Sequence, residues 1–114
     1  MSFKYVASGA FLVASILMWH ASTIAMHLGD FKRANIFLAA MVAFGFLGVR
    51  SFWPPNYFKN IAVLAFGVCS FLMWHATAIS MTPELKDTSL IFAAAAFASV
   101  LLMFASSWAS WKYD

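Results

Sequence analysis

Two histidines, His20 and His75, are the residues of this chain whose type and position could carry chemistry. Each lies well inside a long apolar stretch, where an ionisable side chain is costly and so suggests a function. Neutral imidazole can be an axial ligand of haem iron or chlorophyll magnesium, and two imidazoles at equal depth on neighbouring helices could hold one haem between them. The sequence therefore suggests haem b or chlorophyll as a cofactor, with His20 and His75 as its candidate ligands.

A structural role for the same histidines is the competing interpretation, and it is the one we favour. A neutral imidazole can hydrogen-bond a carbonyl or hydroxyl group of a neighbouring helix, and Ser22, Thr23 and Thr77 are close in sequence. Such bonds contribute about 0.6 kcal/mol on average in membrane proteins. Large side chains dominate near both histidines, which leaves little room for a macrocycle. A role in proton handling is a third interpretation.

A soft-metal site for copper is a further hypothesis. His27 follows His20 by seven residues on roughly the same helix face, and methionines, which are soft ligands, lie nearby in the sequence. Methionine, however, is an ordinary gap-filler in apolar helices, and the counterpart of His27 in the second half of the chain is Thr82. We therefore predict no metal site. The methionines concerned are Met18, Met26, Met73 and Met81.

The motif around each histidine occurs twice, at a spacing of 55 positions: Leu17-Met18-Trp19-His20-Ala21 returns as Leu72-Met73-Trp74-His75-Ala76. In this register, 22 of the 51 residue pairs between 3–53 and 58–108 are identical. Shared apolar composition does not produce such a run in a constant register. We interpret it as a tandem duplication, with repeats at 1–53 and 58–114 and a linker at 54–57.

The composition indicates that a lipid bilayer surrounds these repeats. Hydrophobic residues make up 64% and charged residues 10% of the 114 residues, far from the averages of soluble domains. Four apolar segments, at about 3–28, 34–53, 58–81 and 90–111, each reach the ~20 residues that cross a bilayer as a helix. The predicted fold is an all-α membrane protein of four transmembrane helices, arranged as two hairpins.

The topology follows from the even number of spans, which puts both termini on one side of the membrane. That side carries Lys4, Arg50, Lys59 and Lys112, and the other carries Lys32, Arg33 and Lys86. The excess of basic residues predicts cytoplasmic termini. Because each repeat has two spans, the repeats are parallel and related by a pseudo-two-fold axis along the membrane normal. The net charge of +3, without a basic run, argues against nucleic acid as a partner.

A seam of identical residues runs along the first and third segments at alternating steps of four and three. Small residues at such spacing let helices approach closely in lipid. We predict that these positions form the helix–helix interior: Ala7, Ala10, Leu17 and Ala21, with Ala62, Ala65, Leu72 and Ala76.

Trp19-His20-Ala21 and Trp74-His75-Ala76-Thr77 make the chain resemble the YiaA/YiaB two-helix family of bacterial inner-membrane proteins. That family also consists of duplicated two-span units, with a Trp-Asn-Ala signature near the end of the odd helices. Here His stands where the family has Asn, and the family's Lys-Gly-aromatic linker is missing. The resemblance implies the fold and a bacterial inner-membrane location, and it shows that a non-ligating residue can occupy the histidine position. It implies no activity, because the family has none assigned.

The sequence contains no pattern of an enzyme: no carboxylate lies within a span, no nucleophile is paired with a base, and no phosphate-binding loop occurs. Our leading hypothesis is a small non-enzymatic integral membrane protein, a structural or accessory subunit that packs laterally against other membrane subunits or against itself. The alternative is an electron-transfer or pigment subunit that uses His20 and His75. A small oligomeric transporter or channel is the third hypothesis.

Overall fold

Four long helices make up the chain in this computed structural model, which describes residues 2–109 and 111. They are α1 (Phe3–His27), α2 (Phe31–Arg50), α3 (Phe58–Ile79) and α4 (Lys86–Trp108), with a short 3₁₀ turn, η1 (Pro83–Leu85), before α4. Each helix is long and apolar enough to cross a membrane. The predicted all-α class is thus confirmed, and so is the presence of four helices that are long and apolar enough to span a membrane; these fit a small integral membrane protein. Lys112, and with it the end of the second predicted repeat, lies outside the described residues.

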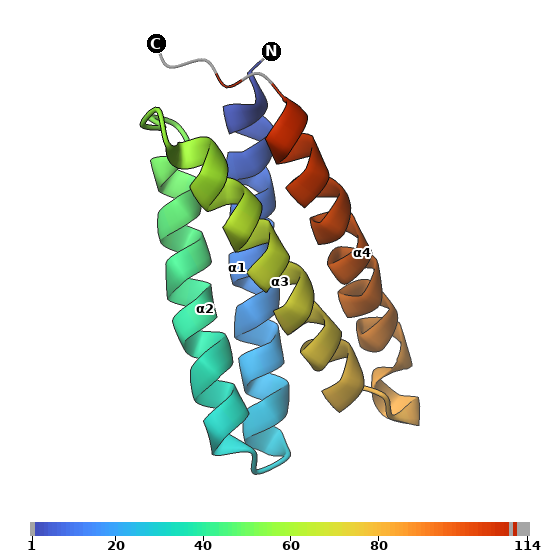
Figure 1. The fold of residues 1–114 in the computed structure, drawn as a ribbon. Coiled ribbons are helices and arrows are strands. Elements are labelled where there is room, and N and C mark those ends of the chain that lie inside the picture. The colour runs from blue at the N-terminus through green and yellow to red at the C-terminus, as the bar shows by residue number, and fades with distance from the viewer. Residues whose placement is uncertain (1, 110, 112–114) are drawn as a thin grey trace.

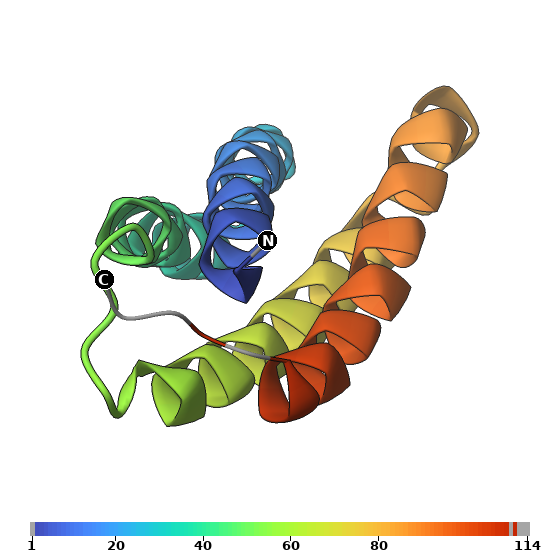
Figure 2. The ribbon, with the colours of Figure 1, turned by 90° about the horizontal axis from the view of Figure 1, so that it is seen from above.

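The helices form two antiparallel hairpins, α1 with α2 and α3 with α4 (Figure 1). Helices α1 and α3 run in the same direction, and the turns that close the two hairpins lie at the same end of the bundle. Seen from above, the hairpins lie side by side with α1 next to α3, and the second hairpin is inclined to the first (Figure 2).

Two helices begin earlier than the sequence predicted. Helix α2 begins at Phe31 rather than near residue 34, because the Asp30 side chain caps it by accepting a hydrogen bond from the Arg33 amide at 3.1 Å. Helix α4 begins at Lys86 rather than near residue 90. The prediction took charged residues to mark the turns, whereas here they occupy the first turns of helices, where they can reach the membrane surface.

The turn between α1 and α2 is compact because it uses a glycine in the left-handed region. Gly29 has φ +77°. Its amide donates to the Met26 carbonyl at 3.1 Å, and the Asp30 amide donates to the Ala25 carbonyl at 2.9 Å. These two bonds are the Schellman arrangement that closes a helix C-terminus. A residue with a Cβ would be strained at Gly29.

Each hairpin is held by a serine that bonds across it. Ser15 of α1 donates to the Met41 carbonyl of α2 at 2.7 Å. Ser70 of α3 donates to the Ala96 carbonyl of α4 at 3.0 Å. Both members of the second pair follow the first by 55 positions, so the two hairpins use the same bond at aligned positions.

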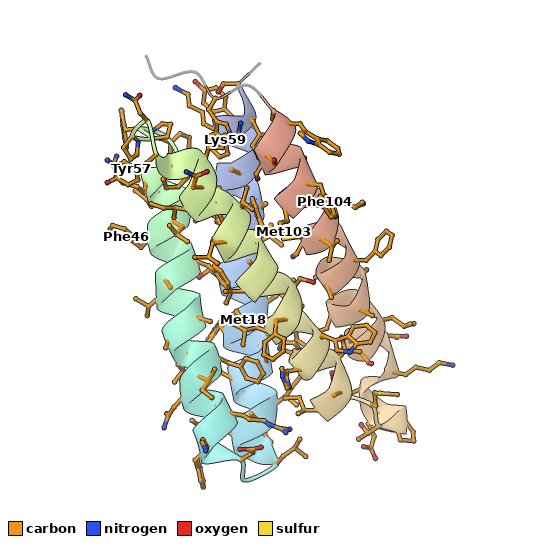
Figure 3. The ribbon with its side chains drawn as sticks, viewed as in Figure 1. Met18, Phe46, Tyr57, Lys59, Met103 and Phe104 are labelled. Carbon is orange, nitrogen blue, oxygen red and sulfur yellow. The ribbon has the colours of Figure 1, made fainter. Side chains whose placement is uncertain are left out.

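Close approach of the helices is achieved differently in the two hairpins. In the first, Leu12 of α1 packs over Gly48 of α2, where a Cβ would lie 2.8 Å from the Leu12 side chain. In the second, Met103 of α4 packs over Gly67 of α3, where a Cβ would lie 3.3 Å from the Met103 sulfur; Figure 3 shows Met103 between these helices. Leu12 aligns with Gly67, and Gly48 aligns with Met103. The large and the small residue have therefore exchanged sides.

The hairpins meet through aromatic rings of α1 and α3. Phe11 and Phe66, which occupy aligned positions, stack with ring centroids 4.4 Å apart and planes 6° from parallel. At the end of the bundle where α1 begins, Trp111 packs edge-on against Phe3 at 5.1 Å and Phe58 at 5.7 Å. Phe3 and Phe58 are again an aligned pair.

The buried stripe of α1 and α3 overlaps the predicted seam but is centred beside it. Half of the seam residues are fully buried, and the other half are partly buried and pack against the core. The large side chains next to them, Phe11 and Met18 with Phe66 and Met73, lie deeper than predicted. The fully buried seam residues are Ala7, Ala21, Ala62 and Ala76, and the partly buried ones are Ala10, Leu17, Ala65 and Leu72.

Candidate functional site

The two histidines have different surroundings. His20 on α1 is exposed, and its ring lies 6.0 Å from that of Phe92 on α4. His75 on α3 is half-buried, and its ring packs against that of Phe71 at 4.6 Å, with the planes 75° apart. Within the described part of the chain, no contact joins the two imidazoles, and neither makes a hydrogen bond.

The threonines near the histidines bond to their own helices. Thr23 donates to the Trp19 carbonyl at 3.1 Å, and Thr77 donates to the Met73 carbonyl at 2.9 Å. The bonds between helices come instead from serines, including Ser15 and Ser70, which the sequence did not identify as helix contacts. Both serines are identical between the two repeats, and this was the sequence feature that could have identified them.

A cavity between α2 and α3 adjoins His75. It has a volume of about 140 Å³ and lies beside the first two turns of α2. Two of its lining side chains, Arg33 and His75, carry hydrogen-bond donors, and the rest are apolar. The lining residues are Arg33, Ile36, Phe37, Phe71, Leu72 and His75.

A second cavity, of about 220 Å³, lies between α1 and α4 with α3 as its floor. It is almost wholly apolar and rich in small residues, including Gly9, Ala10 and Ala98. Ser99 at its wall donates to the Ala95 carbonyl at 2.8 Å and lies 3.3 Å from the Cys69 sulfur. Cys69 is buried and free, and its thiol packs where the first repeat has Ala14.

The residues of the copper hypothesis are divided between the core and the surface. Met18 and Met73 are fully buried, whereas Met26, His27 and Met81 are exposed. Across residues 2–109 and 111, no three side chains of the types His, Cys, Asp or Glu are grouped so that they could hold a metal ion.

Comparisons with known proteins find no relative of this chain. No family model matches it, and no match is found among curated proteins or solved structures.

We expect the purified, untagged protein to have no stoichiometric Soret band. Axial ligation of one haem by His20 and His75 requires both imidazoles to reach the same metal at about 2 Å, whereas here they contact different helices. The measurement is an absorption spectrum of oxidised and reduced protein in mild detergent. A stoichiometric band that shifts on reduction, and that disappears in both His20→Ala and His75→Ala, would contradict the expectation and favour an electron-transfer subunit.

Proposed function

We propose that the protein is a non-enzymatic accessory subunit that packs laterally in a larger membrane complex. The observation that carries this proposal is the apolar groove between the hairpins, the 220 Å³ cavity of α1, α3 and α4. Small residues at the wall of such a groove let the backbone of another transmembrane helix come close, and dispersion contacts then stabilise the pair. We propose a transmembrane helix of another membrane subunit as its occupant.

The proposed architecture is a tandem duplication in which two parallel hairpins are related by a pseudo-two-fold axis along the membrane normal. The serine bonds of Ser15 and Ser70 support this, because they link aligned positions. The stack of Phe11 on Phe66 supports it too, since residues beside a two-fold axis meet their own equivalents. The proposal includes a bacterial inner-membrane location with cytoplasmic termini, as the basic residues and the resemblance to the YiaA/YiaB family predict.

The exposed aromatic residues suit lateral contact with lipid or protein. Trp19 and Trp74, at aligned positions, expose 61% and 66% of their surfaces. Indole rings with one apolar and one polar edge are favourable both at the membrane interface and in protein contacts. They add apolar contact area outside the groove.

The test is blue-native electrophoresis of the protein extracted in mild detergent from its own membrane. We expect it to migrate in an assembly larger than the monomer, and we expect Ala98→Trp to release it, because the indole fills the groove. Ala43→Trp is the matched control: Ala43 is the aligned position of α2, is exposed and lies outside the groove. Migration of the wild-type chain as a lone monomer would contradict the proposal, as would equal effects of the two substitutions.

A further inference from the structure

The cavity between α2 and α3 brings together two donor side chains that come from opposite halves of the chain. Arg33 lies in the first turn of α2, and His75 lies one turn before the end of α3. Neither belongs to the groove of the proposed function. The remaining lining residues are aliphatic and aromatic, and no carboxylate is among them.

The imidazole of His75 has no hydrogen-bond partner among the described residues, although it lies in a helix long and apolar enough to span a membrane. It is half-buried, and its one described interaction is the ring contact with Phe71. A polar group that is taken out of water without a hydrogen bond costs free energy. A ligand atom in the cavity that accepted a bond from the imidazole would remove this cost.

The guanidinium of Arg33 is only partly engaged. Its Nε lies 3.4 Å from an Asp30 carboxylate oxygen, and 48% of the side chain is exposed. The structure gives no partner within the described residues to the terminal nitrogens of the guanidinium. These terminal N–H groups form the fork that suits the oxygens of a phosphate or carboxylate.

The geometry points to a binding site for an anionic phospholipid, whose phosphate is held by Arg33 and His75 while an acyl chain follows the apolar wall. A phosphate offers oxygen acceptors to both donors, and no other lining residue of the cavity offers a side-chain acceptor. The position beside the first turn of α2 is the depth at which lipid headgroups meet the hydrocarbon region. Phe37 and Phe71 supply apolar surface for the chain below the headgroup.

The experiment compares lipids that differ only in their headgroup. Full-length protein in detergent is titrated with phosphatidylglycerol or with phosphatidylcholine of the same acyl chains, and binding is followed by thermal unfolding and by native mass spectrometry. Phosphatidylglycerol should raise the unfolding temperature and remain bound. Phosphatidylcholine should do so much less, because its choline cation offsets the charge of the phosphate and is repelled by Arg33. Inorganic phosphate should have no effect at millimolar concentration, because it lacks the chain.

Variants then assign the headgroup to the site. Arg33→Gln should weaken binding of phosphatidylglycerol by roughly tenfold to a hundredfold, as expected when a hydrogen bond to a charged group is lost. Arg33→Lys should retain part of the affinity, and His75→Gln should weaken binding less than Arg33→Gln does. Lys32→Gln is the matched control, since it removes the same charge one residue away from a side chain that does not line the cavity.

Three results would overturn the assignment. The first is equal binding of the two lipids, and the second is equal loss in Lys32→Gln and Arg33→Gln, which would indicate general attraction to a basic end of the bundle. The third is stabilisation by an uncharged quinone that depends on His75 but not on Arg33, since this would assign the cavity to a neutral ring. The assembly state in blue-native gels reports separately on the groove, so failure of one proposal leaves the other distinguishable.

Discussion

Replacing Gly48 with methionine should destabilise the protein by at least the ~1–3 kcal/mol that is typical of an overpacked core. A Cβ at this position would lie 2.8 and 2.9 Å from two carbons of Leu12 and 3.3 Å from the Ser8 carbonyl oxygen. The Leu12 side chain would have to move, and the helices would have to separate. The bond from the Ser8 hydroxyl to the Gly48 carbonyl, at 2.7 Å, would then lengthen. The measurement is reversible unfolding in mixed micelles.

Adding Leu12→Gly to Gly48→Met should recover most of this loss. The double variant copies into the first hairpin the arrangement of the second, where Gly67 faces Met103. A glycine within a helix costs about 1 kcal/mol relative to alanine, but the double variant only transfers that cost from α2 to α1. A double-mutant cycle should therefore give a favourable coupling energy, whereas strictly additive effects would contradict the exchanged packing. Gly9→Met is the control, because a Cβ there has no neighbour within 4 Å.

Replacing Phe11 with alanine should cost roughly 2–3 kcal/mol, because the void that remains in a packed interior carries its own free-energy cost. In lipid, transfer of the side chain to hydrocarbon contributes little, so this cavity term dominates. Phe11 is fully buried and contacts rings of both hairpins, Phe44 at 6.2 Å and Phe66 at 4.4 Å. The variant should unfold earlier and should also weaken the contact between the hairpins.

A cycle with Phe66→Ala separates the stack from simple loss of volume. We expect a coupling of about 0.5–1.5 kcal/mol between the two positions, the range found for aromatic pairs. Phe46→Ala is the control, because this ring is 68% exposed and projects outward from α2 (Figure 3). A loss in Phe46→Ala equal to that in Phe11→Ala would show that the stack is not a special contact.

The number, type and order of the helices could be predicted because each apolar segment is long enough to span a bilayer and is bounded by turn residues. Gly29 and Pro83 mark the ends of the hairpins in the sequence as they do in the structure. The first turn of α2 could not be placed, because a charged turn and a charged first turn of a helix look alike in composition. Only the cap by Asp30 decides between them.

Which side of each helix is buried was harder to predict than where each helix lies in the sequence. In a soluble protein the polar face of a helix is turned to water, so the opposite face can be predicted to be buried. Helix α1 is apolar on all sides, and Phe11, which is buried, is as hydrophobic as its exposed neighbour Leu12. Identity between the repeats reduced the number of residues that could form the buried face, but Ala10 and Phe11 are both identical in the second repeat, so identity could not show which of them lies deeper. The site depends on the same information: His75 could be found from the sequence, but its sharing of a cavity with Arg33 depends on how the two hairpins are set against each other.

Each hairpin closes through contacts between its own two helices, so the two hairpins can fold one after the other during synthesis of the chain. The bond from Ser15 to Met41 and the contact of Leu12 with Gly48 join residues of α1 and α2 alone, so the first hairpin can insert and close while the ribosome is still translating the second. Pro54 and Pro55, which have no amide hydrogen, then let the chain change direction without extending α2. We expect docking of Phe11 on Phe66 to follow, within the bilayer, between two hairpins that have each closed on themselves.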